Sequence, residues 1–212
     1  RRLVQGTNAA GDTISAPYDR LVLATGSNPF ILPLPGHELA GVLAYRDIAD
    51  TQAMIDAAAK YRHAVVIGGG LLGLEAANGL MKRGMQVSVV HASEWLMERQ
   101  LDDVAGKMLQ QSLAERGMQF LMQAQTQELL ADDAGPNARV RAVRFKDGSE
   151  VPADLVVMAV GIRPNTALAQ SMHLHVDRGI VVSDTLQTVT DPRIYAVGEC
   201  AAHRGVAYGL VA

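Results

Sequence analysis

The stretch VVIGGGLLGLEAA, residues 65–77, decides the fold of this chain. It begins as a run of β-branched apolar residues and continues as an apolar helix pattern, with glycines spaced G-x-G-x-x-G between the two. Gly68 permits a tight turn at the end of the strand. Gly70 lets a ligand approach the backbone where no Cβ stands, and Gly73 lets the helix pack closely on the strand. The stretch therefore predicts the strand, turn and helix of a βαβ unit.

The predicted turn opens onto the N-terminus of a helix. The first N–H groups of a helix have no intrahelical partner and lie at the positive end of its dipole, so they suit a pyrophosphate. We predict that this loop binds a dinucleotide; the alternative is a glycine-rich strand-to-helix turn without a ligand. The expected contacts come from Gly68, Gly69, Gly70, Leu71, Leu72 and Gly73.

The residue at the end of the next strand is expected to contact the adenosine ribose. An acidic residue about 20 positions beyond the loop normally accepts a hydrogen bond from that sugar, and here His91 holds the place. A neutral His91 would bond a ribose hydroxyl, whereas a protonated one would favour a 2'-phosphate, and Arg99 lies within reach through a loop. The choice between NADH and NADPH stays open. The alternative for His91 is a strand-end histidine that faces solvent.

Further apolar runs surround this unit. Continuous β-branched runs bounded by glycine are typical of buried parallel strands, and amphipathic stretches that stop at glycine are typical of helices. Short alternating runs around an Asp-Gly turn predict an antiparallel meander laid on the sheet. The predicted strands are 18–25, 64–67, 86–90, 118–122, 154–160 and 194–197, the helices 50–61, 71–83 and 101–116, and the meander 126–131, 139–145 and residues from 151. The fold class is α/β, a Rossmann-like parallel sheet with a β-meander.

Composition narrows the classes of function. Of the 212 residues, 49% are hydrophobic and 19% are charged, which is typical of a globular protein. The net charge of −3 gives no basic surface to attract nucleic acid or an anionic membrane, and no apolar run approaches a bilayer span. We expect a cytoplasmic protein with neither partner. The single cysteine, Cys200, excludes a disulfide reductase and a thiolate metal site within the chain, so no metal ligand is predicted.

Two more strand ends carry glycine, Ala24-Thr25-Gly26 near the start and Gly198-Glu199 near the end. Each alone is an ordinary turn. Their order around the glycine loop resembles the FAD-dependent pyridine nucleotide-disulfide oxidoreductases, in which such strand ends belong to an FAD domain and G-x-G-x-x-G lies in an inserted NAD(P)H domain. The resemblance runs from about residue 18 to the end. It implies that Ala24, Thr25, Gly26, Gly198 and Glu199 lie near FAD, with Glu199 one methylene longer than the usual aspartate.

The same resemblance implies residues for the nicotinamide half of NAD(P)H. Gly161 and Arg163, which follow a hydrophobic strand, would lie near it. Glu75, on the helix after the loop, matches a glutamate often found beside the nicotinamide ring and is the candidate catalytic residue. The alternative for Glu75 is a partly buried helix carboxylate paired with a cation.

Within that superfamily, residues 68–77, 95–106 and 198–212 resemble the large subunits of NAD(P)H-dependent assimilatory nitrite reductases and their nitrate-reductase electron-transfer relatives. This implies that hydride passes from NAD(P)H to FAD. Electrons would then pass on to iron–sulfur and sirohaem centres that reduce nitrite to ammonia. A ferredoxin or rubredoxin reductase is one alternative, and a nucleotide-binding module without catalysis is another.

The sequence predicts three segments. Residues 1–43 and 183–212 are expected to be parts of an FAD-binding domain, and residues 44–182 the NAD(P)H-binding domain. The chain has no second G-x-G-x-x-G and no initial Met. We therefore expect a fragment whose partners include the remainder of the FAD domain, and which binds NAD(P)H but is inactive alone.

Overall fold

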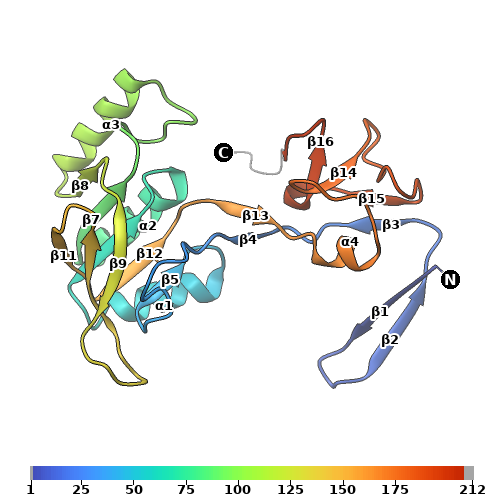
Figure 1. The fold of residues 1–212 in the computed structure, drawn as a ribbon, viewed down its shortest axis with the longest axis horizontal. Coiled ribbons are helices and arrows are strands. Elements are labelled where there is room, and N and C mark those ends of the chain that lie inside the picture. Colours follow the sequence, from blue (N-terminus) through green and yellow to red (C-terminus); the bar gives the residue numbers. More distant parts are fainter. Residues whose placement is uncertain (1, 208–212) are drawn as a thin grey trace. The chain divides into compact units, whose positions relative to one another are not determined.

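The structure, a computed structural model, describes residues 2–207 (Figure 1). It divides into a central unit, residues 29–161, and an end unit made of the residues before and after it. The predicted boundaries at 43/44 and 182/183 differ from this division, and strand pairing gives the reason. β5 (Val42–Ala44) pairs within the sheet of the central unit, while β14 (Ile180–Val182) pairs with β16 (Ala201–His203) in the end unit.

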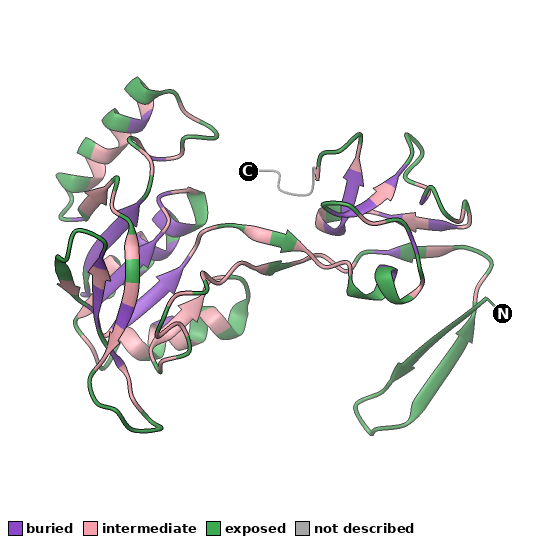
Figure 2. Ribbon diagram, viewed as in Figure 1, coloured by how far each residue is buried: buried purple, intermediate pink, exposed green. Residues whose placement is uncertain are grey.

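The central unit is built on a parallel sheet of five strands in the order β5-β12-β6-β7-β8. This confirms the predicted α/β class. The buried residues of the unit are concentrated in the inner strands (Figure 2), as expected for a parallel sheet covered on both faces. The remaining strand bounds are β6 (His63–Ile67), β7 (Gln86–His91), β8 (Gln119–Met122) and β12 (Leu155–Met158).

The two faces of this sheet have different covers, because successive side chains of a strand point to opposite sides. Val66 packs into a core with the three helices, whereas Val65 and Ile67 pack into a second core with the meander. The central unit therefore has three layers, and the predicted meander on the sheet is confirmed. The helices are α1 (Ile48–Ala58), α2 (Leu71–Lys82) and α3 (Asp103–Ala114), and the meander strands are β9 (Thr126–Ala131), β10 (Val140–Phe145) and β11 (Glu150–Pro152).

The βαβ unit of β6, α2 and β7 forms as its sequence predicts. α2 buries Leu74, Ala77 and Leu80, which recur at helical spacing and lie against the sheet. Gly84 follows the helix with φ +89°, a conformation that glycine adopts without strain and that commonly ends helices. β6 then pairs in parallel with residues 86–90 of β7.

The end unit consists of short elements around its own small core. β3 (Leu21–Leu23) pairs in parallel with β15 (Ile194–Ala196), and the 3-10 turn η1 (Gly198–Cys200) follows. Cys200 is buried in this core beside the carbonyl oxygens of Leu23 and Val197. The other elements are α4 (Ala167–Ser171) and a two-stranded pairing of β4 (Ser27–Pro29) with β13 (Ile162–Pro164).

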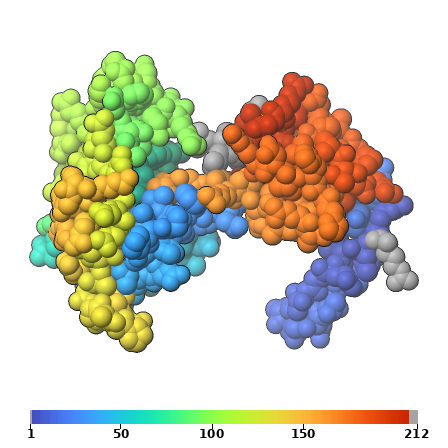
Figure 3. Space-filling view, viewed as in Figure 1, coloured from blue at the N-terminus to red at the C-terminus, as the bar shows by residue number. Residues whose placement is uncertain are grey.

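A β-hairpin precedes β3 and was not predicted. β1 (Leu3–Thr7) pairs with β2 (Thr13–Pro17), and every residue of both strands is exposed. In the space-filling view it stands out as a separate blue finger (Figure 3). Neither face of the hairpin is buried, so the alternation of Thr13-Ile14-Ser15-Ala16 in β2 does not mark a core-facing strand. Among residues 2–207, no helix has the length and apolar character that crossing a membrane requires.

Candidate functional site

The predicted loop lies at the carboxyl edge of the central sheet. Residues 68–70 follow β6, the segment 92–102 follows β7, and Gly161 lies shortly beyond the end of β12. In open parallel sheets this edge is where ligands bind, because the loops that leave adjacent strands converge there. The fold thus brings together three segments that are far apart in the sequence.

The three glycines of the motif have distinct steric roles. Gly68 turns the chain with φ +122°, and a Cβ there would collide with the carbonyl group of Ala159. A Cβ on Gly73 would collide with the carbonyl oxygen of Gly68, so this glycine sets the close approach of helix to strand. A Cβ on Gly70 would meet open space. Among residues 2–207, no neighbouring atom requires glycine at position 70, which fits the expectation that a ligand approaches there.

The N-terminus of α2 offers unfilled donors. Gly70 is the N-cap residue and no side chain caps the helix. Within residues 2–207, no hydrogen bond is recorded for the N–H groups of Gly70, Leu71 and Leu72. The Leu71 and Leu72 side chains are 36% and 37% exposed, so they add apolar surface beside these donors. The loop is therefore not blocked by its own side chains, and it presents what an anionic ligand needs.

His91, the last residue of β7, is buried and turned into the protein. Its Nδ1 accepts a hydrogen bond from the Gly69 N–H at 3.1 Å. Its Nε2 lies 3.1 Å from the carbonyl oxygen of Trp95 and 3.0 Å from Oε2 of Glu98. Both expectations for His91, a ribose contact or a solvent-facing ring, require its ring nitrogens to lie at the protein surface. The structure differs because Gly69, having no Cβ, leaves room for the ring directly beneath the loop.

The residues after β7 complete this arrangement around Gly69. Leu96 is fully buried against Gly69, and the Met97 N–H donates to the Gly69 carbonyl oxygen at 3.0 Å. The Trp95 indole N–H donates to the carbonyl oxygen of Leu101 at 3.1 Å, which closes the segment on itself. In the sequence these residues belong to the stretch 95–106, whose signal was its resemblance to nitrite reductase large subunits. We call residues 95–98 together with His91 the loop clamp.

The other residues predicted near NAD(P)H lie at exposed positions. Arg99 is exposed on the segment after the loop clamp, and Arg163 is exposed in β13. Glu75 is exposed on α2 and has no recorded ion pair among the described residues, which differs from the alternative of a partly buried carboxylate paired with a cation. Gly161 has φ +111°, and its carbonyl oxygen accepts from the N–H of Phe30 at 2.9 Å.

The residues predicted near FAD come together in the end unit. The parallel pairing of β3 with β15 sets Ala24-Thr25-Gly26 beside Gly198-Glu199, although some 170 residues separate them. The Thr25 hydroxyl donates to the carbonyl oxygen of Asn165 at 2.6 Å, and the Ser27 hydroxyl donates to Oε2 of Glu199 at 2.8 Å. Glu199 is half-buried and Gly198 adopts φ +74°. Part of the final resembling stretch, residues 208–212, lies outside the described residues.

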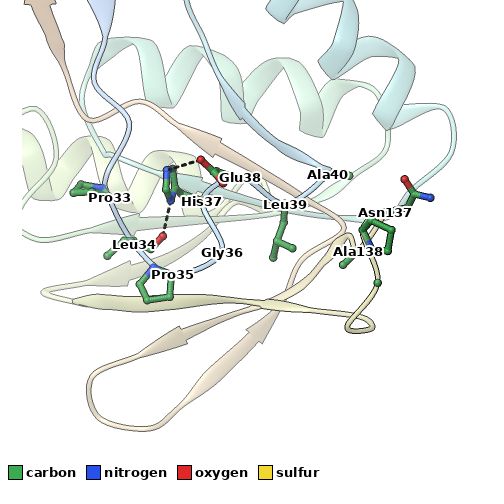
Figure 4. A pocket seen from close by; sticks show the side chains of 12 residues that line it. Pro33, Leu34, Pro35, Gly36, His37, Glu38, Leu39, Ala40, Asn137 and Ala138 are labelled. Carbon is green, nitrogen blue, oxygen red and sulfur yellow. Dashed lines mark hydrogen bonds and ion pairs between the residues drawn. The ribbon is translucent and has the colours of Figure 1, made fainter.

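A surface hollow of about 770 Å³ lies elsewhere in the central unit (Figure 4). It is lined by residues 33–40 and 135–138, none of which belongs to the predicted site. His37 lies over it with Nδ1 2.9 Å from the carbonyl oxygen of Leu34. In the described part of the chain no group of three side chains is arranged to hold a metal ion.

A glycine loop with unfilled helix donors at the carboxyl edge of a parallel sheet defines a dinucleotide-binding α/β protein. The chain belongs to the pyridine nucleotide-disulphide oxidoreductase family, whose pattern matches residues 1–211. Solved structures agree. A NAD-dependent persulfide reductase from A. fulgidus superposes with a TM-score of 0.87 at 29% identity, over 95% of this chain and 36% of that one. A ferredoxin reductase from Rhodopseudomonas palustris superposes with a TM-score of 0.83 at 32% identity, over 95% of this chain and 48% of that one.

Curated relatives at higher identity are named for nitrogen metabolism. The chain is 60% identical to a nitrite reductase [NAD(P)H] of Bacillus subtilis, over 92% of this chain and 24% of that protein. It is 50% identical to an assimilatory nitrate reductase electron transfer subunit of the same organism, with the same coverage. The chain thus spans about a quarter of the length of these two relatives.

Proposed function

We propose that the central unit binds NAD(P)H, with the pyrophosphate held by the backbone N–H groups of Gly70, Leu71 and Leu72. The observation that carries this proposal is the uncapped N-terminus of α2, which directs these groups outward at the carboxyl edge of the sheet. Gly70 supports it, because a Cβ at this position would occupy open space that the ligand needs. Gly68, Gly69 and Gly73 shape the backbone that presents these donors.

The nicotinamide half of the ligand would lie toward Glu75 and Gly161. Glu75 is exposed on α2, one turn beyond the donors, so its carboxylate is accessible to a bound ligand. Arg163 lies two residues beyond Gly161 and supplies a cation for that half. On the adenosine side Arg99 is exposed and available to a ribose or a 2'-phosphate, while His91 acts through the loop as described below.

The end unit would contribute to an FAD site. Ala24, Thr25 and Gly26 leave one strand beside Gly198 and Glu199, which leave its parallel partner. Glu199, held by the Ser27 hydroxyl, offers a carboxylate oxygen to a polyol chain. The chain encodes a single G-x-G-x-x-G loop, so the FAD pyrophosphate needs a cradle from other residues. FAD, when bound, supplies the acceptor for the nicotinamide hydride, and the chain's own residues orient the reactants and exclude water.

For the whole protein we propose reduction of nitrite to ammonia with electrons drawn from NAD(P)H. The support is the 60% identity with a nitrite reductase. Iron–sulfur and sirohaem centres need several cysteine ligands. The 212 residues contain one cysteine, Cys200, so these centres need ligands from other residues of the whole protein. We also propose a cytoplasmic location, where NAD(P)H is available, and no nucleic acid or membrane partner. An acidic net charge of −3 supports both exclusions.

Titration calorimetry of the 212-residue chain with NADH, NADPH and FAD tests this assignment. We expect measurable binding of at least one nicotinamide dinucleotide and weak or absent binding of FAD. The comparison of NADH with NADPH also settles which coenzyme is preferred. Tight FAD binding without NAD(P)H binding would overturn the division into sites.

A ferredoxin-type reductase is the second candidate, because the Rhodopseudomonas palustris enzyme superposes closely on this chain. The purified gene product, supplied with NADH or NADPH, decides between the two. Nitrite-dependent oxidation of the coenzyme supports nitrite reduction. Oxidation that needs an added ferredoxin or rubredoxin supports the second candidate. A protein that binds the coenzyme but carries no reducible flavin is a nucleotide-binding module without catalysis.

A further inference from the structure

The backbone of Gly69, in the middle of the glycine loop, is held through both its N–H and its carbonyl group by the loop clamp. Its N–H donates to His91 Nδ1 at 3.1 Å, and its carbonyl oxygen accepts from the Met97 N–H at 3.0 Å. Leu96 and the His91 ring pack against the position where a Cβ would stand. The neighbouring N–H of Gly68 is taken by the Val90 carbonyl oxygen at 2.8 Å. The first amide of the loop left for a ligand is therefore that of Gly70.

These contacts fix the protonation of His91. A backbone N–H can only donate, so Nδ1 must carry a lone pair toward Gly69. The partners of Nε2 are the Trp95 carbonyl oxygen and the Glu98 carboxylate, which are both acceptors, so Nε2 carries the hydrogen. The ring is thus neutral and in the Nε2–H form. In the described structure, the charged group in contact with this ring is the Glu98 carboxylate. The glycine loop and the segment after β8 contact His91 through backbone atoms.

We propose that His91 is a positioning residue of the dinucleotide site: its neutral ring draws the Gly69 amide inward and so sets the backbone that aims the Gly70, Leu71 and Leu72 amides at the pyrophosphate. This inference rests on the proposed function. It gives a physical role to the histidine that stands where an acid was expected. Both ring nitrogens are engaged inside the protein, so His91 acts on the ligand through the loop and makes no ribose contact of its own.

Two substitutions distinguish the contact of His91 with Gly69 from its contacts with Trp95 and Glu98 in the loop clamp. In His91→Asn the amide oxygen stands the same number of bonds from Cα as Nδ1, so it can accept from Gly69. In His91→Gln the terminal amide matches Nε2, so it can reach Trp95 and Glu98 but leaves the Gly69 N–H without its acceptor. We expect His91→Asn to bind NADH or NADPH within about threefold of the parent chain and His91→Gln to bind about tenfold more weakly or worse. Equal binding by the two variants, or tighter binding by His91→Gln, overturns the proposal.

Matched controls are His63→Asn and His63→Gln, which change the histidine at the opposite end of β6 and should leave affinity unchanged.

The tautomer can be measured without any ligand. Nitrogen-15 spectra of the parent chain should give His91 in the Nε2–H form at neutral pH, and an Nδ1–H form overturns the proposal even where the variants fail to fold. The two levels of inference fail differently. If the parent chain binds neither NADH nor NADPH, the proposed function fails and this inference with it; if the parent binds but His91→Gln matches His91→Asn, only the positioning role fails.

Discussion

Single residues around α2 show how one residue type serves different ends. Gly70, Gly73 and Gly79 all have helical or extended backbones without positive φ, so none of them needs glycine for its conformation. What distinguishes them is the space around a new Cβ. At Gly73 the Gly68 carbonyl oxygen occupies that space, whereas at Gly70 and Gly79 it is open. Only the loop position, Gly70, also faces the proposed ligand.

Alanine substitutions at these glycines should therefore separate folding from binding. Gly73→Ala should destabilise the chain by about 1–3 kcal/mol, because the helix must move off the strand. Gly70→Ala should change stability by less than about 1 kcal/mol yet weaken NAD(P)H binding about tenfold or more. Gly79→Ala, the control, should raise the free energy of unfolding by about 0.5–1 kcal/mol and leave NAD(P)H binding unchanged. Denaturant titration and calorimetry measure the two effects. Unchanged affinity in Gly70→Ala would contradict the proposed pyrophosphate position.

At the scale of elements, Asp154 ties the start of β12 to the start of β6. Its Oδ2 accepts from the N–H groups of His63 and Arg62 at 2.8 and 3.1 Å. Burial raises the pKa of this carboxyl, but hydrogen bonds from the His63 and Arg62 N–H groups outweigh it, and the net pKa lies below its ordinary value. The ionised carboxylate thus stabilises the amino edge of the sheet, opposite the proposed site.

Asp154→Asn should cost about 1 kcal/mol at neutral pH, since the side chain is partly exposed and an amide oxygen can still accept. Because the folded-state pKa is lowered, the stabilisation from Asp154 is complete above the unfolded-state value of about 4 and is lost as pH falls through the folded value. The difference in stability between the parent and Asp154→Asn should shrink below about pH 4. Denaturant titrations at several pH values measure it, and a difference that widens on acidification would show the sign to be wrong.

Leu80 joins α2 to the helix-side core of the sheet and is 1% exposed. Leu80→Ala should cost about 2–5 kcal/mol, because it leaves a cavity between helix and sheet. Leu72→Ala on the exposed side of the same helix is the matched control for stability and should cost less than about 1 kcal/mol. Equal losses for the two variants in thermal or denaturant unfolding would contradict the layer arrangement.

At the scale of the whole molecule, the buried cores respect the division into two units. Both cores of the central unit are drawn from residues 29–161, and the third core is drawn from the end unit. The end unit's strand β15 pairs with β3, from the opposite end of the sequence. The central unit is thus continuous in sequence, whereas the end unit needs both flanking segments.

A protein consisting of residues 29–161 should therefore fold with one cooperative transition and bind NAD(P)H within about tenfold of the 212-residue chain, because it keeps the pyrophosphate donors and loses only Arg163 from the proposed site. Residues 162–212 alone should not fold, because β15 would lack its partner β3. Circular dichroism during thermal unfolding and calorimetric titration are the measurements. A central unit that folds but binds more than about tenfold more weakly would show that the end unit contributes to the coenzyme site.

Much of the fold was predictable because its signals are local. The glycine spacing, the β-branched runs and the helix that stops at Gly84 predicted β6, α2 and β7 almost to the residue. The exposed hairpin before β3 was missed because it buries no face. The predicted boundaries at 43/44 and 182/183 differ from the division into two units because β5 and β14 are three-residue strands whose pairing depends on distant partners.

The sequence by itself determined the βαβ unit and the steric roles of Gly68 and Gly73, because those follow from spacing and from the absence of a Cβ. Only the tertiary structure decided what His91 does. The direction of its ring depends on the cavity beneath Gly69 and on acceptors supplied by Trp95 and Glu98. The meeting of Ser27 with Glu199 was likewise decided by the parallel pairing of β3 and β15. Contacts between distant residues are set by packing, which no local pattern encodes.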